Sequence, residues 1–306
     1  MKIAILGTGA MGSVYAALLA AAGNEVWAID PWRAHIDAIR ATGLRVEGAS
    51  GDRLVASVKA TVDPAEAGPC DLVIVATKAR DVEAAVRGAG PLLSPQTAVL
   101  FMQNGLGSSD LARAHLPPGR ALLGVAQAFG ASMKGPGHAH HNAMDLIRIG
   151  EVEGGPSERV SRLVETWQEA GFRAQGEADI TRLIWEKFVC NVTFSAPCTV
   201  FGRLVGAMMD DPATWRICTG CAVEAYRAGR ARGVPFSFDD PVAYVTAYGG
   251  KVRGARPSML LDHLARRPSE IDFLNGAAAR LSQESGLDAP YNETLAAIVR
   301  DREAAF

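Results

Sequence analysis

The sequence has few of the features that mark several large classes of protein. Its 306 residues include 5 cysteines, scattered at positions 70, 190, 198, 218 and 221. So few and so scattered cysteines exclude a disulfide-stapled secreted domain and suit a reducing compartment. The formal net charge is −2 and no long block carries one sign, so no nucleic-acid-binding surface is predicted. We therefore expect a globular cytoplasmic protein.

Long uninterrupted hydrophobic runs are also missing. The best candidate, "FVCNVTFSAPCTVF", contains Asn191 and Pro197 and is too short to span a bilayer. No internal repeat or low-complexity tract interrupts the chain. With 48% hydrophobic residues, the chain can bury two separate cores of ordinary size.

The opening stretch "MKIAILGTGAMGSVYAALLAAAGNEVWAID" has no charged residue from Ile3 to Gly23 and allows two interpretations. A basic start and an apolar run could form a secretory signal peptide. The alternative is a buried strand at 3–6, the pattern G-x-G-x-x-G, a helix of apolar residues at helical spacing, and a second strand at 25–30. The strand-turn-helix context favours the second interpretation, a dinucleotide-binding site.

Each glycine of this pattern has its own physical reason. Gly7 permits a tight turn, Gly9 lets a pyrophosphate approach the backbone, and Gly12 lets the helix pack closely on the strand. Asp30 ends the second strand, where a carboxylate can bind the adenosine ribose. The predicted cofactor-binding residues of this region are Gly7, Thr8, Gly9, Ala10, Met11, Gly12 and Asp30.

Alternating strand and helix patterns continue to about residue 171. Strands are predicted at 44–48, 52–60, 71–78, 97–105, 121–130 and 145–150, the last at a sheet edge, and helices at 34–43, 80–90 and 157–171. From about residue 179 only helical patterns follow, at 179–195, 212–233, 257–267, 269–286 and 290–306. We therefore predict an α/β protein: a Rossmann-type, doubly wound parallel sheet domain over 1–177, followed by an all-α domain over 178–306. A substrate site is expected in the cleft between them.

Two predicted strands end in polar residues on the side where the cofactor is expected. "VIVATKARD" places Lys78 there, and "VLFMQNGLG" places Asn104 before Gly105. Ligands of open α/β sheets bind beyond the carboxyl ends of the strands. The alternatives, a solvated loop lysine and an ordinary Asn-Gly turn, stay open on the residues alone.

The helical region contains a lysine in apolar surroundings. "LIWEKFVCN" places Lys187 and Asn191 one turn apart on a helix face. Lys187 could extend its ammonium to solvent from the edge of a core. It could instead be partly desolvated, which lowers a lysine pKa and suits a proton donor to a carbonyl.

Ser258 and Glu270 also stand out, in "RPSMLLDHLARRPSEIDFLNG". A structural interpretation makes Ser258 a helix N-cap after Pro257 and makes Glu270 a first-turn acid that complements a helix dipole.

Two other groupings are not expected to carry chemistry. "GHAHHN" contains His138, His140 and His141 without a recognisable partner spacing, so a polar hairpin is predicted there and no metal site. Cys218 and Cys221 form a C-x-x-C inside a helical pattern, which indicates buried helix cysteines.

Taken together, "ILGTGAMGS", "ATKARD", "QNGLG", "WEKFVCN" and "PSMLLDHLARRPSEIDFLNG" resemble the ketopantoate reductase (2-dehydropantoate 2-reductase) family over nearly the whole chain. The resemblance implies a 6-phosphogluconate-dehydrogenase-like helical domain, a homodimer, and an NAD- or NADP-dependent oxidoreductase of pantothenate and coenzyme A biosynthesis. It implies reduction of 2-dehydropantoate to pantoate, with Lys187 as general acid and Glu270 holding the substrate hydroxyl and positioning Lys187. The other residues that it implies are Asn104, Asn191, Ser195 and Ser258 at the substrate, and Lys78, Asn104 and Glu270 at the cofactor.

Two positions depart from the family pattern. Well-known members carry a basic residue after the second strand and prefer NADPH, whereas this chain has Asp30-Pro31. An anionic Asp30 repels a ribose 2′-phosphate, so NADH preference is predicted.

Ser195 stands where the family often has a substrate-binding asparagine. An NAD-dependent D-2-hydroxyacid dehydrogenase acting on another 2-oxo acid is therefore an alternative function. A non-catalytic nucleotide-binding regulator is a third, disfavoured by the presence of Lys187 and Glu270.

Overall fold

The computed structural model describes residues 1–306 and divides them into two compact units. The first comprises residues 1–103 and 108–180, and the second comprises residues 104–107 and 181–306. None of the helices has the length and apolar composition needed to cross a membrane.

The first unit is built on an eight-stranded sheet of order β12-β11-β8-β7-β6-β1-β2-β5. Strands β8 and β11 pair antiparallel, and all other neighbours pair parallel. The strands are β1 (Lys2–Leu6), β2 (Glu25–Ile29), β5 (Lys59–Thr61), β6 (Leu72–Val75), β7 (Ala98–Phe101), β8 (Ala121–Gln127), β11 (Leu146–Glu151) and β12 (Ala174–Glu177). The prediction of an edge strand at 145–150 is wrong, because β12 pairs outside β11.

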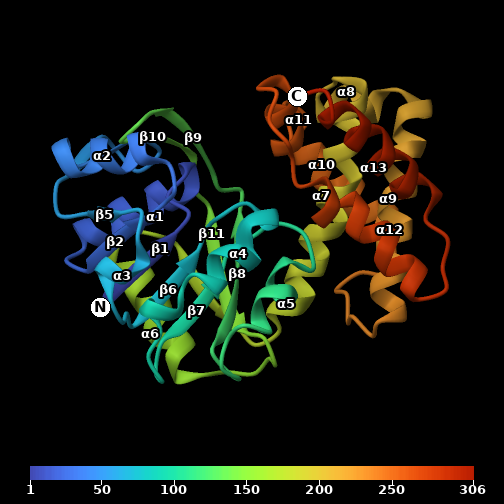
Figure 1. Ribbon diagram of the computed structural model, residues 1–306. Coiled ribbons are helices and arrows are strands. Elements are labelled where there is room, and N and C mark those ends of the chain that lie inside the picture. The colour runs from blue at the N-terminus through green and yellow to red at the C-terminus, as the bar shows by residue number, and fades with distance from the viewer. The chain divides into compact units, whose positions relative to one another are not determined.

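A smaller sheet of order β4-β3-β10-β9 lies against helix α1 (Ala10–Ala21), which separates it from the large sheet (Figure 1). Its strands are β3 (Leu44–Gly48), β4 (Arg53–Val55), β9 (Gly130–Gly135) and β10 (His138–Ala143). The helices of this unit are α1 (Ala10–Ala21), α2 (Arg33–Thr42), α3 (Pro64–Ala67), α4 (Val82–Arg87), α5 (Ser108–Arg113) and α6 (Glu158–Glu169), with 3₁₀ turns η1 (Ala79–Asp81) and η2 (Gly90–Leu92).

An aromatic cluster fixes α1 against its surroundings. Tyr15 is fully buried, and its ring meets Trp167 edge-on at 5.0 Å and lies 5.7 Å from the ring of Phe129. Removing the apolar ring surface from water stabilises this packing by roughly 25 cal/mol per Å² buried. The residues that follow β1 are therefore attached to a well-anchored helix.

Strand register brings the predicted cofactor residues to one edge of the sheet. Leu6 pairs with Ile29 on one side and Val75 on the other, and Val75 also pairs with Phe101. The chain therefore leaves all four strands at the same edge, where ligands of open α/β sheets bind.

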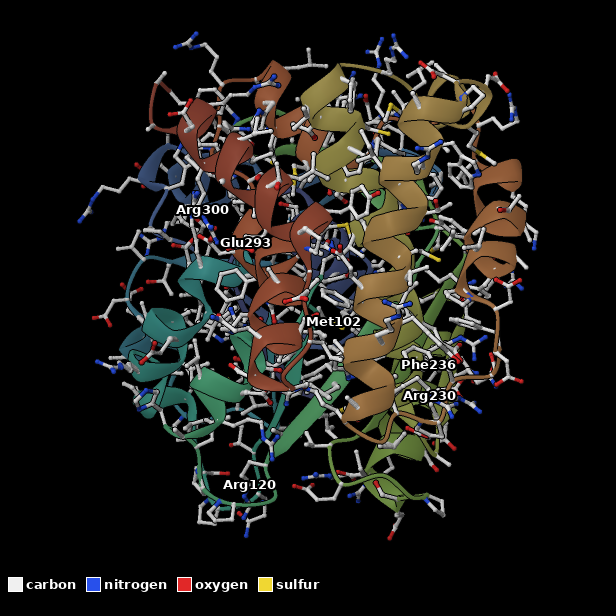
Figure 2. The ribbon with its side chains drawn as sticks, turned by 90° about the vertical axis from the view of Figure 1, so that its right-hand side faces the viewer. Met102, Arg120, Arg230, Phe236, Glu293 and Arg300 are labelled. Carbon is white, nitrogen blue, oxygen red and sulfur yellow. The ribbon has the colours of Figure 1, made fainter.

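The second unit is helical, as predicted. It contains α7 (Ile180–Phe201), α8 (Val205–Asp210), α9 (Pro212–Ala231), α10 (Pro241–Lys251), α11 (Ser258–Leu264), the 3₁₀ turn η3 (Ile271–Phe273), α12 (Asn275–Glu284) and α13 (Pro290–Glu303). Phe236 packs close to α9, where a side chain on Gly229 would meet its ring (Figure 2). The prediction of one helix over 269–286 is wrong, because Leu274 (φ −111°, ψ −107°) breaks it into η3 and α12.

Candidate functional site

The glycine-rich turn after β1 has a different geometry at each of its three glycines. Gly7 has a φ of +87°, and a Cβ there would lie 2.6 Å from the Thr77 nitrogen. A Cβ on Gly12 would collide with the Gly7 carbonyl oxygen, so close packing of helix on strand requires glycine there. A Cβ on Gly9 would meet nothing within 4 Å. The protein's own packing therefore needs glycine at 7 and 12, whereas at 9 the absence of a side chain leaves room for a ligand.

Several polar groups at this turn fit a phosphate-bearing cofactor. The N-cap of α1 is Gly9, which supplies no side-chain cap, and its first turn contains no acid. The backbone N–H groups of that turn therefore lack a protein partner and carry the positive end of the helix dipole. The Thr8 hydroxyl is buried without a hydrogen-bond partner. These donors suit a pyrophosphate.

Asp30 follows β2 and shapes the next loop. Its Oδ1 accepts a hydrogen bond of 2.9 Å from the Trp32 backbone N–H, which leaves Oδ2 without a protein partner in this turn. Trp32 is 40% exposed. The carboxylate is thus held at the strand end where a ribose hydroxyl would be bound.

The ends of β6 and β7 are tied together by a residue that the sequence analysis missed. Gln103 donates its side-chain amide to the Val75 and Thr77 carbonyls at 2.8 and 3.2 Å. Lys78 is exposed directly beyond, as the N-cap of η1. Gln103 begins the motif "QNGLG", but nothing in that pattern marks its side chain as the link between two strand ends.

In the second unit, Lys187, Asn191 and Ser195 follow one another at four-residue spacing along α7. They form a polar stripe on one face of a helix that also buries many apolar side chains. Helix α7 continues to Phe201 through Pro197, beyond its predicted end at 195. Lys187 and Asn191 are half-buried, and Ser195 is 5% exposed.

Lys187 and Glu270 are brought together by the fold, from positions far apart in the sequence. Desolvation lowers the pKa of the Lys187 ammonium from its usual 10.5 to about 8, and the Glu270 carboxylate opposes this shift. A lysine with this pKa still carries its proton at neutral pH and can release it. Both side chains are half-buried, so neither is an ordinary solvent-exposed charge.

A buried amide network holds the segment that carries Glu270. Asn275 is fully buried and donates to the Val192 carbonyl of α7 at 2.9 Å and to Asn292 Oδ1 at 2.8 Å. Asn292 in turn donates to the buried Glu224 carboxylate at 2.7 Å. The start of α12 is thereby fixed to α7, α9 and α13.

The rest of the "EIDFLNG" motif is also structural. Arg300 lies on α13 (Figure 2), and its side chain donates to Asp272 Oδ1 at 2.7 Å. Gly276 is packed so closely that a Cβ would lie 3.0 Å from the Ile271 carbonyl oxygen. Most of this motif therefore serves to place Glu270.

Asn104 reaches the same region through a four-residue segment. Residues 104–107 group with the second unit, although the chain on both sides belongs to the first. The Leu106 N–H donates to the Phe273 carbonyl at 2.9 Å, and Gly105 (φ +84°) packs against that carbonyl without room for a Cβ. Asn104 is thus attached to the turn that follows Glu270.

Ser258 and Glu270 do not fit their structural interpretations. Ser258 is exposed as the first residue of α11, and the N-cap is Pro257, without a side-chain cap. Glu270 is the N-cap of a three-residue 3₁₀ turn and makes no cap hydrogen bond. Ser258 begins α11, whereas Lys187 and Asn191 lie on α7.

The histidines and the C-x-x-C cysteines occupy structural positions. His138 and His140 lie on β10, which forms a hairpin with β9, and both contact the Glu47 carboxylate, at 3.1 and 3.3 Å. No group of three or more His, Cys, Asp or Glu has the arrangement needed to hold a metal ion. Cys218 and Cys221 are buried in α9, as predicted.

Comparison with known proteins agrees with this architecture. The family described as "Ketopantoate reductase PanE/ApbA" matches residues 3–154, and its C-terminal counterpart matches residues 179–303. A "2-dehydropantoate 2-reductase" of Mesorhizobium japonicum is 32% identical, over 98% of this chain and 97% of that protein. One of Streptococcus pyogenes serotype M3 is 28% identical over 100% and 99%.

Solved structures give the same result. A PanE/ApbA family ketopantoate reductase from Ralstonia eutropha superposes with a TM-score of 0.91 at 30% identity, covering 100% of this chain and 99% of that one. D-Mandelate dehydrogenase with NADH and anilino(oxo)acetate gives a TM-score of 0.91 at 25% identity, with the same coverage. The chain therefore belongs to the ketopantoate reductase family of NAD(P)-dependent oxidoreductases, which are classed as acting on CH–OH groups and use a small keto acid as substrate.

Proposed function

We propose that this enzyme reduces 2-dehydropantoate to pantoate, as a step of pantothenate and coenzyme A biosynthesis. Residues 1–177 form the cofactor domain and residues 178–306 the substrate domain. The observation that carries the proposal is Lys187, whose pKa is lowered to about 8 by desolvation while Glu270 supplies the opposing charge. A carbonyl reduction needs a group of this kind.

The first domain binds and orients the cofactor. The backbone amides at the start of α1 and the Thr8 hydroxyl hold the pyrophosphate, and Gly9 lets it approach. Asp30 accepts hydrogen bonds from the ribose hydroxyls and repels a 2′-phosphate, so NADH is preferred over NADPH. Lys78 lies beside the cofactor, and Asn104 and Glu270 contact it. When bound, the reduced nicotinamide supplies the hydride.

The second domain supplies the proton and the substrate contacts. Lys187 Nζ transfers a proton to the substrate carbonyl oxygen as negative charge develops there. Glu270 accepts a hydrogen bond from the substrate hydroxyl and positions the Lys187 ammonium. Asn104, Asn191 and Ser258 donate to the substrate's oxygens.

Initial rates of NADH and NADPH oxidation with 2-dehydropantoate test this proposal directly. We expect turnover, with a higher kcat/KM for NADH. Binding of either nucleotide without turnover of any 2-oxo acid contradicts the assignment.

Ser195 supports a second candidate, an NAD-dependent D-2-hydroxyacid dehydrogenase. A serine is shorter than asparagine and offers fewer donors to a hydroxylated substrate, and Ser195 is 5% exposed. The likeness to D-mandelate dehydrogenase is in keeping with this candidate. A kcat/KM for phenylglyoxylate that exceeds the value for 2-dehydropantoate favours it.

We further propose a cytoplasmic homodimer. The five cysteines are all free and buried, which suits a reducing compartment. Light scattering coupled to gel filtration measures the oligomeric state, for which we expect twice the 32.2 kDa chain mass.

A further inference from the structure

His35, near the start of α2, is completely buried beside both loops that we assign to the cofactor. Its backbone N–H donates to the Trp32 carbonyl at 3.0 Å. Both nitrogens of a buried imidazole need partners, and these partners decide which nitrogen carries the proton.

The two ring nitrogens of His35 link separate elements. The Gly137 backbone N–H, in the turn between β9 and β10, donates to Nδ1 at 2.9 Å. Nδ1 is therefore an acceptor, and the neutral ring carries its proton on Nε2. Nε2 lies 3.3 Å from Ser13 Oγ, which donates to the Thr8 carbonyl at 2.9 Å. A chain of hydrogen bonds thus runs from the small sheet to the glycine-rich turn.

This chain of bonds orients one peptide group of the turn. The Thr8 carbonyl points toward Ser13. In a trans peptide the carbonyl and the next N–H point in opposite directions, so the Gly9 N–H is directed away from Ser13. Gly9 is also the glycine at which the protein's own packing leaves space for a side chain.

The imidazole also supports the second loop. Its ring stacks on the Trp32 indole, with centroids 5.1 Å apart and planes at 12°. The Trp32 N–H is the group that donates to Asp30 Oδ1. The His35 side chain is therefore linked to the turn at Gly7–Gly12 through Ser13, and to the loop with Asp30 through Trp32.

We propose that His35, in its neutral form, is a positioning residue that holds the glycine-rich turn and the Asp30 loop in the arrangement that binds the dinucleotide. The inference rests on the proposed cofactor site and acts through Thr8, Ser13 and Trp32. Neither a histidine nor a serine at these positions belongs to the G-x-G-x-x-G pattern.

The surroundings of His35 keep it neutral. Burial lowers the pKa of the imidazole, and the charged group that opposes this is Asp30. Helix α1 contains no charged residue, and the turn 135–137 contributes only backbone groups. Protonation would turn Nδ1 into a donor facing the Gly137 N–H. Cofactor affinity is thus expected to hold at neutral pH and to weaken as the pH falls through the lowered pKa.

Calorimetric titration of NADH into the whole protein tests the role. His35→Phe keeps a ring for stacking but removes both hydrogen bonds, and we expect the NADH Kd to rise about five- to tenfold. The kcat at saturating NADH and the KM of the 2-oxo acid should change by less than about twofold, because the effect is on cofactor binding. Ser13→Ala should weaken binding similarly, and the double variant should bind no more weakly than His35→Phe.

His140→Phe is the matched control, because this histidine of the small sheet contacts Glu47 instead. Its NADH Kd should be unchanged. An unchanged Kd in folded His35→Phe, additive losses in the double variant, or an equal loss in His140→Phe overturns the inference. Should His35→Phe not fold, Ser13→Ala decides in the same way. Wild-type protein that binds neither NADH nor NADPH instead overturns the proposed function itself.

Discussion

The glycine-rich turn of the first unit and the polar stripe of α7 in the second are built by different means. In the turn, backbone geometry and the absence of side chains make the proposed cofactor site, as at Gly7 and Gly12. On α7, side chains make the proposed substrate site, and the pKa of Lys187 depends on burial and on Glu270. A site made of backbone tolerates little change in spacing, whereas a site made of side chains depends on which segments pack together.

This difference predicts separable defects. Substitutions in the turn should change nucleotide affinity and leave proton transfer intact. Substitutions on the polar stripe of α7 should impair proton transfer and leave nucleotide affinity intact.

The largest expected effect comes from Lys187→Ala. Loss of the proton donor should lower kcat by about 10²–10⁴-fold. The NADH Kd should be nearly unchanged, because Lys187 is not among the residues that we propose to contact the nucleotide. The matched control is Lys251→Ala, an exposed lysine at the end of α10, which should retain full activity. Near-normal turnover of Lys187→Ala removes this residue from the mechanism.

Within the turn, Gly12→Ala and Gly9→Ala should separate stability from binding. The Cβ that Gly12→Ala introduces would collide with the Gly7 carbonyl, so this variant should lower the free energy of unfolding by about 1–3 kcal/mol. The Cβ that Gly9→Ala introduces meets no protein atom within 4 Å, so Tm should stay unchanged while the NADH Kd rises about tenfold, or ~1.4 kcal/mol. Thermal unfolding and calorimetric titration measure both. Equal loss of stability in the two variants contradicts the distinction.

A smaller effect is expected from Asp30→Asn, which removes charge and keeps the shape of the side chain. The preference for NADH over NADPH should fall, by about tenfold or less, because repulsion of the 2′-phosphate is lost. Asp37→Asn, an exposed acid on α2, is the control. Wild-type protein that binds NADPH as tightly as NADH shows that Asp30 does not discriminate.

The sequence predicted the backbone-made site more completely than its surroundings. Glycine spacing after a buried strand has few structural solutions, so Gly7, Gly9 and Gly12 could be assigned separate geometries in advance. His35 could not be found in this way, because its partners Ser13 and Gly137 come from other elements and no spacing relates them.

The helical region shows where local patterns fail. The apolar periodicity of 269–286 continues through Leu274, but the Asn275 network fixes α12 to α7 and the helix breaks there. Helices α8 and α10 were missed, since their short segments carry a weak pattern. Strand β12, with the sequence AQGE, has no hydrophobic alternation, and only its pairing with β11 reveals it.

The most direct test of the account is the pH dependence of kcat for carbonyl reduction, in wild-type protein and in Glu270→Gln. A general acid must carry its proton, so kcat should fall as the pH rises through about 8, the pKa of Lys187. The Glu270 carboxylate raises that pKa, so its removal should move the descending limb to lower pH. Circular dichroism and thermal unfolding verify that Glu270→Gln is folded. A limb that is absent, or that stays in place or moves to higher pH in the variant, contradicts proton donation by Lys187 under the control of Glu270.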